Sequence, residues 1–359
     1  MTVQIDWAAR IKQGILATSL AALMATVTVT NAQITLIAGE AGPNRGARAA
    51  ALQSFADDVD KRSNGEVNIN IQWGGALFKS GAALQSISDG VADLGTIIGV
   101  YFPQEMLGYG IADLPLENPD AWVGMRATDE LMRSDSALQE NLAANNLVYI
   151  GTFTTSAVNI GCQGATIKTV EDINGLKVRG VGAYGNTFRD YGANMVNLSI
   201  YDAYQALDSG LIDCSQGYSY AVAALKQQEV MSSYTMLDWG QVGALGIFMN
   251  KEIYDSLEQD VRTILDESGM AMADTLGELI TADNDKAIET LQSAGVEIIE
   301  LPAAERDKLV EKGKPYIDEW VERADSTGFE GAALLDNYRA LIEKYTAERD
   351  EKGYPWARN

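Results

Sequence analysis

The sequence of 359 residues predicts an α/β fold in two lobes. The chain is 47% hydrophobic and 21% charged, an ordinary globular balance, and it is long enough for two domains. Predicted strands and helices alternate along it, which is typical of α/β sheets. Residues 251–294 form one long helical pattern, interrupted only by two glycines, and such a helix spans about 60 Å. A helix of that length is longer than the diameter of one small domain.

The first predicted unit is a strand, a helix and a second strand. Residues 34–38 are an apolar strand that runs into a glycine-containing loop over 39–46, where a helix begins. That helix is amphipathic, because its apolar residues recur at helical spacing until the stop at Asn64-Gly65. Residues 67–73 then alternate, which places an apolar face and Trp73 on the same side of the strand.

The following segments continue the alternation of strands and helices. We expect a helix over 80–90, a strand over 93–100, a helix over 121–146 and a strand over 147–153, after which 154–159 cross into the second lobe. The C-terminal part is predicted as a returning strand, the long helix, a closing strand and two surface helices, over 242–249, 251–294, 296–301, 303–325 and 332–350.

Arg179 is the most informative residue of the second lobe. The segment 170–179 is a short acidic turn, a glycine stop and an alternating run that ends at Arg179. A helical turn over 201–207 and an apolar strand over 211–215 follow, and this order predicts a parallel pair of strands. Ligands bind beyond the carboxyl ends of such strands, so the guanidinium group is placed to meet a ligand.

The chemistry of Arg179 indicates an anionic ligand. A planar guanidinium group offers paired donors that fit a carboxylate, which an ammonium group cannot do. The alternative is a structural ion pair with a nearby acid such as Asp213. The residues by themselves leave both interpretations open.

Charge and composition exclude several classes of function. The net charge is −23 and the chain has no histidine, so histidine triads, histidine bases and histidine metal sites are excluded. Such an acidic chain lacks the basic footprint of a nucleic-acid-binding protein. The sequence also has no Gly-x-Ser-x-Gly nucleophile motif. We therefore predict a protein that is not an enzyme, uses no cofactor and no metal, and binds no nucleic acid.

Residues 1–32 are predicted to be an export signal peptide. Arg10 and Lys12 supply the positive flank, residues 14–29 the apolar run, and residues 30–32 a cleavage site of small residues. The apolar run is about 16 residues, shorter than the ~20 of a stable membrane span. A membrane anchor is the alternative. Export would place the mature chain in the periplasm.

The two cysteines, Cys162 and Cys214, lie in the same predicted lobe on neighbouring strand regions. In an exported protein two thiols favour a disulfide. In the entropic model a bridge that closes a loop of this length stabilises the fold by about 4 kcal/mol. Two buried free thiols are the alternative, and geometry decides between them.

Three stretches are similar to a known family. Residues 175–179 are Gly-Leu-Lys-Val-Arg, residues 206–217 are Ala-Leu-Asp-Ser-Gly-Leu-Ile-Asp-Cys-Ser-Gln-Gly, and residues 113–116 are Asp-Leu-Pro-Leu. These stretches, together with the order of elements over the mature chain, resemble the solute-binding proteins of tripartite ATP-independent periplasmic (TRAP) transporters, the DctP family. The strength of the resemblance lies in the ordered set of elements more than in any one motif.

The resemblance implies a two-lobe periplasmic binding protein fold with a long inter-domain helix and a ligand cleft between the lobes. Lobe I is expected over 33–155 plus 243–282, and lobe II over 156–242 plus 283–359. The resemblance also implies that Arg179 forms a salt bridge with the carboxylate of a small organic anion. The protein is then expected to act as a monomer that delivers this ligand to the membrane permease subunits of a TRAP transporter.

Departures from the family pattern bear on the ligand. Asn159 stands where several family members carry another arginine, while Gln216 and Gly217 replace a glutamate and an asparagine. A second full negative charge would then lack a fixed partner, at a cost of several kcal/mol if desolvated. We therefore expect a monoanion: a monocarboxylate with an apolar or aromatic body, a sulfonate, or a zwitterion whose cation rests on aromatic rings.

The predicted ligand contacts lie at strand ends and glycine turns, where aromatic residues gather and favour a cleft with apolar walls. Lys79 is a second candidate cation, and a solvated lysine at a helix start is its alternative. The predicted ligand-binding residues are Arg179, Asn159, Trp73, Tyr101, Gly217, Tyr218, Trp239, Lys79 and Glu40. The alternative functions are binding of a C4-dicarboxylate and ligand sensing for a signalling partner.

Overall fold

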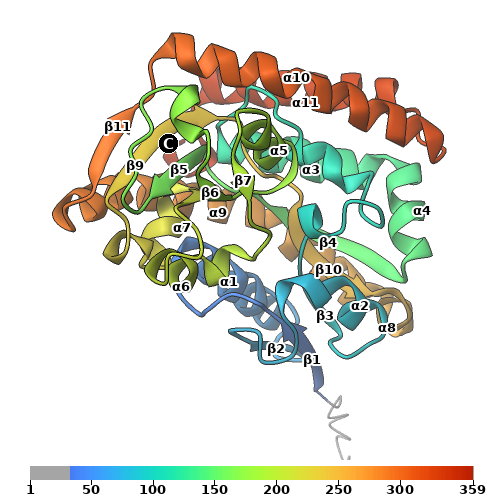
Figure 1. The fold of residues 1–359 in the computed structure, drawn as a ribbon. Helices are drawn as coiled ribbons and strands as arrows, with labels where there is room; N and C mark the ends of the chain where they lie inside the picture. The colour runs from blue at the N-terminus through green and yellow to red at the C-terminus, as the bar shows by residue number, and fades with distance from the viewer. Residues whose placement is uncertain (1–32, 359) are drawn as a thin grey trace, which may run out of the picture. The chain divides into compact units, whose positions relative to one another are not determined.

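The computed structural model describes residues 33–358, and the predicted signal peptide lies outside the described residues. The described chain forms two lobes, each built around one sheet (Figure 1). The strand order is β2-β1-β3-β10-β4 in the first sheet and β11-β9-β5-β8-β6-β7 in the second. Helices flank both sheets, so the predicted α/β class is confirmed.

The first sheet is formed by four strands from residues 34–153 and by one strand that returns from the second lobe. Its strands are β1 (Ile34–Gly39), β2 (Val67–Gln72), β3 (Leu94–Ile98), β4 (Leu147–Phe153) and β10 (Leu245–Asn250). β1 pairs in parallel with β2 and β3, and β10 lies antiparallel between β3 and β4. The helices of this lobe are α1 (Gly46–Arg62), α2 (Ala83–Ser88), α3 (Ala121–Ser134), α4 (Ser136–Ala144) and α8 (Lys251–Ser256), with 3₁₀ turns at Ser80–Ala82, Gly99–Tyr101 and Tyr109–Asp113.

The second sheet follows the same plan with one antiparallel strand, β5. Its strands are β5 (Val158–Cys162), β6 (Lys177–Arg179), β7 (Asn194–Met195), β8 (Cys214–Gly217), β9 (Ser233–Trp239) and β11 (Glu297–Glu300). β6 and β8 are parallel, as the sequence predicts. The helices are α5 (Gly182–Asp190), α6 (Ala203–Asp208) and α7 (Ser219–Ala224), with 3₁₀ turns at Val170–Ile173, Ile200–Asp202 and Gln227–Glu229.

Two extended segments connect the lobes. Residues 154–157 link β4 to β5, and residues 240–244 link β9 to β10. They lie side by side, because Thr155 N donates to Val242 O at 3.1 Å and Val242 N donates to Thr155 Oγ1 at 2.9 Å. Each segment therefore restrains the other at the point where the chain passes between the sheets.

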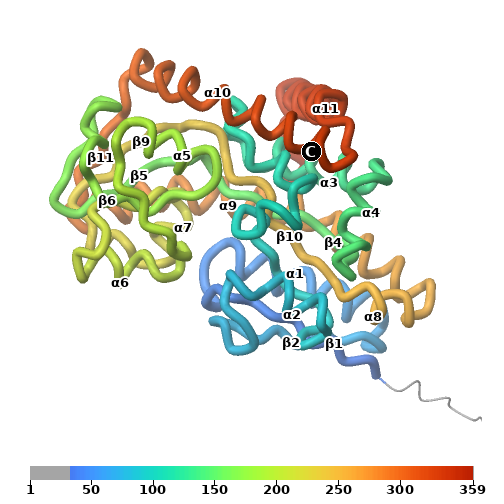
Figure 2. Tube along the Cα trace, turned by 45° about the vertical axis from the view of Figure 1, so that its right-hand side comes forward, coloured from blue at the N-terminus to red at the C-terminus, as the bar shows by residue number. Residues whose placement is uncertain are grey.

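The long helix starts later than predicted. α8 ends at Ser256, Leu257 is extended with φ −74° and ψ 152°, and α9 covers Gln259–Ser293. α9 packs against α1 and β4 of the first lobe and against α7 and β11 of the second, so the predicted long inter-domain helix is confirmed (Figure 2). Gly269 permits the close approach to β4, since a Cβ there would lie 2.0 Å from Ile150 O.

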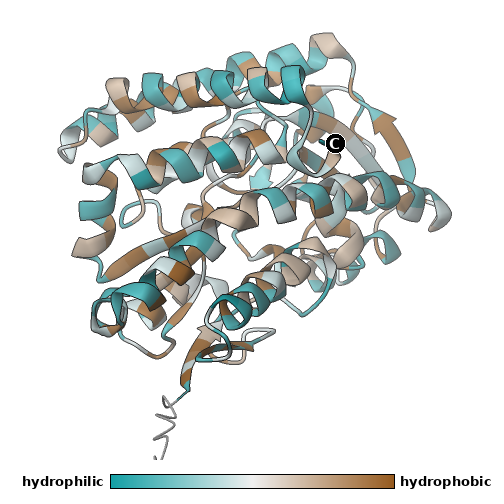
Figure 3. Cartoon of the chain, turned by 180° about the vertical axis from the view of Figure 1, so that it is seen from behind, coloured by the Kyte–Doolittle hydropathy of each residue, from teal (hydrophilic) through white to brown (hydrophobic). Residues whose placement is uncertain are grey.

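The chain ends in two long helices and a final 3₁₀ turn, Pro355–Ala357. α10 (Ala303–Ser326) and α11 (Gly331–Lys352) pack against each other, α10 also contacts α5, and α11 lies along α3. Two buried hydrogen bonds hold them: Trp320 Nε1 donates to Leu107 O at 3.0 Å, and the Thr128 and Tyr338 hydroxyls lie 3.0 Å apart. Hydrophilic and hydrophobic residues alternate along both helices, as expected when one face is buried (Figure 3).

A disulfide joins Cys162 of β5 to Cys214 of β8. The two residues are directly paired in the antiparallel register, with their Cα atoms 4.0 Å apart. The sequence leaves a disulfide and two free thiols open, and the register places the two sulfur atoms together. The bridge therefore joins adjacent strands of the second sheet whose cysteines are 52 residues apart in the chain.

Asp113 is a buried carboxyl group beside the segment that returns to the first lobe. Its Oδ1 accepts from Ala244 N at 2.9 Å, while its Oδ2 has no hydrogen-bond partner among the described residues. Burial raises the pKa of Asp113 to about 7. The folded protein therefore holds this proton more tightly than the unfolded chain does.

We expect Asp113 to make stability fall as the pH rises. Because its folded pKa exceeds its unfolded value, its favourable contribution is complete below about pH 4 and is lost as the pH passes 7. Between pH 5 and 8 the wild type should lose about 2–3 kcal/mol relative to Asp113→Asn, which cannot ionise. Denaturant unfolding of both proteins at the two pH values measures this difference, and parallel curves would contradict it.

Candidate functional site

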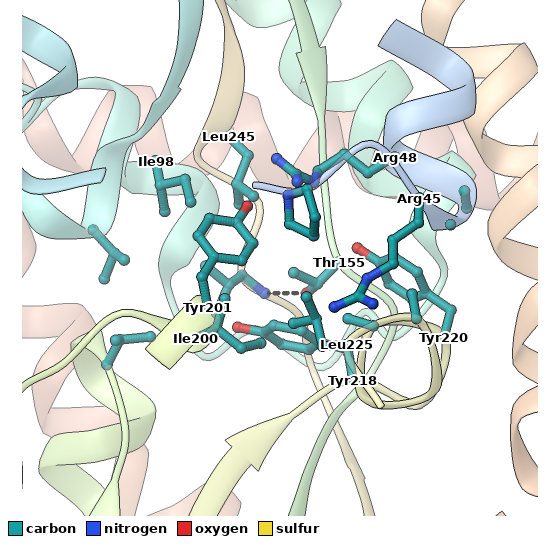
Figure 4. Close-up of a pocket in the computed structure, with 18 of the residues that line it drawn as sticks. Arg45, Arg48, Ile98, Thr155, Ile200, Tyr201, Tyr218, Tyr220, Leu225 and Leu245 are labelled. Atoms are coloured by element: carbon teal, nitrogen blue, oxygen red, sulfur yellow. Dashed lines mark hydrogen bonds between the residues drawn. The ribbon is translucent and has the colours of Figure 1, made fainter. Parts of the chain in front are cut away.

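A pocket lies between the lobes, and we call it the inter-lobe pocket. It holds about 650 Å³ of space free of protein atoms, its open mouth included. Its walls come from the start of α1, the end of β3, the two connecting segments and the chain after β6 and β8. Figure 4 shows Arg45 and Arg48 of the α1 region on one side and Ile200 and Tyr201 on the other.

Arg179 reaches the pocket from the end of β6 and is 1% exposed. Its Nε donates to Leu198 O at 3.1 Å, and its two terminal nitrogens donate to Gln216 O and to the Tyr101 hydroxyl, each at 3.0 Å. These partners are neutral, and none of the ion pairs formed by the described residues includes Arg179. A buried charge without a counter-charge is costly, so the arrangement favours an anion in the pocket.

The alternative ion pair of Arg179 with Asp213 is wrong. Asp213 lies just before β8, at the start of the strand pair, where its Oδ1 is 3.4 Å from Lys177 Nζ and its Oδ2 accepts from Lys177 N at 2.8 Å. The parallel register explains this, because it sets Val178 opposite Cys214 and leaves Asp213 level with Lys177.

Arg48 also lines the pocket, but its charge is balanced. Its Nη1 lies 2.6 Å from Glu40 Oε1, and its guanidinium group lies over the Tyr201 ring, 5.1 Å from the ring centre. Burial lowers the pKa of Arg48, but the charge and hydrogen bond of Glu40, together with Tyr201 and Tyr220, raise it by more in sum, so the pKa lies above its ordinary value. Glu40 Oε2 accepts from the Thr96 hydroxyl at 2.7 Å, so this pair is a fixed part of the wall.

Arg45 is the third arginine of the pocket. Its side chain is exposed and forms no ion pair or side-chain hydrogen bond within residues 33–358. Figure 4 shows its guanidinium group turned into the pocket, near Tyr220 and Thr155. Arg45 also precedes α1, whose first turn has no side-chain cap and no acidic residue, so the positive end of that helix faces the same space.

The rest of the wall is apolar or aromatic. Besides Thr155, it is formed by Pro43, Gly46, Ala47, Ile98, Val100, Tyr101, Val181, Ile200, Tyr201, Tyr218, Tyr220, Ala221, Ala224, Leu225, Val242 and Leu245. Burial raises the pKa of Tyr220 to about 12 and also raises the pKa values of Tyr201 and Tyr218. These phenols therefore stay neutral at ordinary pH, and no acidic side chain lines the pocket.

The structure places three of the predicted contact residues in this pocket: Arg179, Tyr101 and Tyr218. Tyr101 comes from the first lobe and Arg179 from the second, so their hydrogen bond joins the lobes. A second contact of this kind lies nearby, where the Ser80 and Ser199 hydroxyls are 3.3 Å apart.

Asn159 and Gly217 are paired opposite each other in β5 and β8 and do not line the pocket. Asn159 Oδ1 accepts from Asp238 N at 2.9 Å, and Asp238 has a φ of 46° where the register between β5 and β9 shifts. Asn159 therefore stabilises a bulge. A Cβ on Gly217 would lie 2.7 Å from Val222 Cγ2, so glycine lets α7 pack closely on β8.

Four further predicted residues lie outside the wall. Trp73 is half-buried against the core, and Lys79 is exposed with its Nζ 3.5 Å from Gly74 O. Trp239 is buried, with its ring 4.8 Å from that of Tyr184. Glu40 approaches the pocket only through Arg48.

The sequence interpretation missed the contribution of the α1 region. Arg45 and Arg48 follow a glycine-containing loop after the first strand, which is the same signal that singled out Arg179 at a strand end. Tyr201 and Tyr220 lie in segments predicted only as a helix turn and a strand end. Whether these two tyrosine side chains face the pocket depends on how the lobes pack, and no local sequence pattern indicates it.

Other kinds of site find no support in the described residues. In the range 33–358, no group of three acidic, histidine or cysteine side chains is arranged to hold a metal ion. No helix in this range is long and apolar enough to cross a membrane.

Comparison with protein families gives one match that covers most of the chain. Residues 38–324 match the model of the bacterial extracellular solute-binding proteins, family 7. The matched range includes the whole inter-lobe pocket.

Individual relatives agree with this match. A solute-binding protein of Albidiferax ferrireducens is 27% identical over 70% of this chain and 74% of its own length. The C4-dicarboxylate-binding periplasmic protein DctP of Rhodobacter capsulatus is 24% identical over 75% of this chain and 81% of its own. A TRAP solute-binding protein from Rhodoferax ferrireducens, solved in complex with co-purified benzoate, has a TM-score of 0.81 at 24% identity and covers 88% of this chain and 99% of its own.

Proposed function

Because the chain belongs to family 7 of the bacterial extracellular solute-binding proteins, which serve TRAP transporters, we propose that it captures a small monocarboxylate. It then delivers this acid in the periplasm to the membrane permease subunits of the transporter. In this proposal residues 1–32 direct export, and the two lobes have the boundaries 33–155 plus 243–282 and 156–242 plus 283–359. The protein acts as a monomeric carrier without catalysis.

The observation that carries the proposal is the state of Arg179. Its guanidinium group is buried, opens onto the inter-lobe pocket and is held in place by three neutral oxygen atoms. Fixed neutral acceptors orient the group without neutralising it. A carboxylate that enters the pocket supplies the missing charge and pairs with a donor array already in position.

The wall supports a ligand with an apolar or aromatic body. Aliphatic and tyrosine side chains make up most of it, and burying apolar ligand surface against them stabilises the complex by about 25 cal/mol per Å². Relatives of this chain bind either kind of acid: one was solved with the monocarboxylate benzoate, and another is a C4-dicarboxylate-binding protein. Of the three arginines, Arg48 is balanced by Glu40 and Arg45 is exposed, so Arg179 is the one buried, unbalanced charge. One buried, unbalanced positive charge matches a ligand with one carboxylate, so the charges of the wall favour a monocarboxylate.

A thermal-shift panel tests the ligand class. Benzoate, phenylacetate and short aliphatic monocarboxylates should raise the Tm by several degrees near 100 times their Kd, where ligand binding stabilises by about 2.7 kcal/mol. Succinate, malate and fumarate should give smaller shifts at equal concentration. Stabilisation by the dicarboxylates alone would contradict the monocarboxylate and favour C4-dicarboxylate binding instead.

A further inference from the structure

Several polar groups of the inter-lobe pocket are free to donate hydrogen bonds. Thr155 is 2% exposed, and its Oγ1 already accepts from Val242 N at 2.9 Å, so its hydroxyl proton is left to donate. The Tyr201 hydroxyl and the Arg45 guanidinium group have no hydrogen-bond partner within residues 33–358. All three side chains line the pocket. A ligand meets donors here in addition to Arg179.

The carboxylate nearest to the pocket is not free to pair with a ligand cation. Glu40 is the carboxylate directly behind the wall. Its Oε1 accepts from Gly42 N and Arg48 Nη1, and its Oε2 accepts from the Thr96 hydroxyl. The face of the Tyr201 ring, which could hold a ligand ammonium group, is covered by the guanidinium group of Arg48.

The charges of the wall have one sign. Its ionised side chains are Arg45, Arg48 and Arg179, with no aspartate or glutamate, in a chain of net charge −23. One further carboxylate, Asp283, adds to the raised pKa of Tyr220, but it does not line the pocket. The uncapped start of α1 adds a positive helix end.

We infer that the pocket rejects ligands with an ammonium group and prefers acids whose second polar group is a hydroxyl or keto oxygen. This inference rests on the proposed function and narrows its ligand class. Arg179 holds the carboxylate, and Arg45, Thr155 and Tyr201 donate to the second oxygen. An ammonium group at the same carbon finds no carboxylate in the wall, where the only ionised side chains are arginines. Zwitterions, which the sequence alone admits, are therefore excluded.

The test compares matched derivatives of the best acid in the thermal-shift panel. For a phenylalkanoate these are phenyllactate, phenylpyruvate and phenylalanine, and for a short aliphatic acid they are lactate, pyruvate and alanine. Calorimetry with the mature protein at pH 7.5 should give a Kd for the ammonium derivative at least about 100-fold higher than for the hydroxyl derivative, since like charges would be juxtaposed.

Arg45→Glu is the variant that isolates the charge. It should reduce the ratio of the two Kd values at least about tenfold, because a carboxylate then faces the ammonium group. Lys61→Gln is the matched control, since it removes one positive charge from the exposed end of the same helix, outside the pocket. The control should leave the ratio unchanged.

Two results would overturn the inference. The first is an ammonium derivative that binds the wild type within about tenfold of the hydroxyl derivative, and the second is an equal ratio in Arg45→Glu and Lys61→Gln. If the wild type binds none of the panel acids, the proposed function itself fails, and the inference falls with it. Binding of the unsubstituted acid separates these two failures.

Discussion

Replacing Arg179 by alanine is expected to weaken binding of the organic acid by about 3–5 kcal/mol, a loss of at least about 100-fold in affinity. The variant leaves the ligand carboxylate in a pocket with no other buried cation free to pair with it. Arg179→Lys should also lose affinity, because an ammonium group cannot make directed bonds to Leu198 O, Gln216 O and the ligand together.

Calorimetry with the best acid of the panel measures this loss. Arg189→Ala is the matched control, because Arg189 is an exposed arginine of α5 in the same lobe and does not line the pocket. Since Arg179 also bonds to buried oxygen atoms, thermal unfolding without ligand must accompany the titration to show that the variant is folded. A folded Arg179→Ala protein with wild-type affinity would remove the anchor role.

Opening the disulfide is the second change with a large expected effect. The bridge spans 52 residues of chain, and the entropic model assigns a loop of that length about 4 kcal/mol of stability. The oxidised wild type should therefore unfold at clearly higher denaturant concentration than the Cys162→Ala/Cys214→Ala double variant.

Denaturant unfolding followed by circular dichroism measures the difference, with the wild type in reductant as a further comparison. Reductant should lower the midpoint of the wild type and leave that of the double variant unchanged. Identical midpoints for oxidised and reduced wild type would show that the bridge contributes no stability. The bridge joins β5 to β8 and neither cysteine lines the pocket, so ligand affinity should change little in the folded variants.

Local sequence patterns predicted most of the regular structure. The alternation over 67–72, the apolar run of 147–153 and the helical spacing of α1 depend on neighbours in the chain, and each element formed where its pattern indicated. The breaks between α3 and α4 and between α8 and α9 were not predicted from the sequence. Asp135 ends α3 and caps α4 by accepting from Leu138 N at 3.0 Å, within a segment predicted as one helix.

Sequence alone determined the α/β class, the long helix and the position of Arg179 at the end of a strand, because strand ends and glycine stops are local signals. The tertiary structure decided which charges remain unbalanced. Asp213 pairs with Lys177 because of the strand register, and Glu40 neutralises Arg48 because a buried loop folds back on α1. Pairing of charges depends on distances between side chains of different segments, and those distances exist only once each lobe has folded.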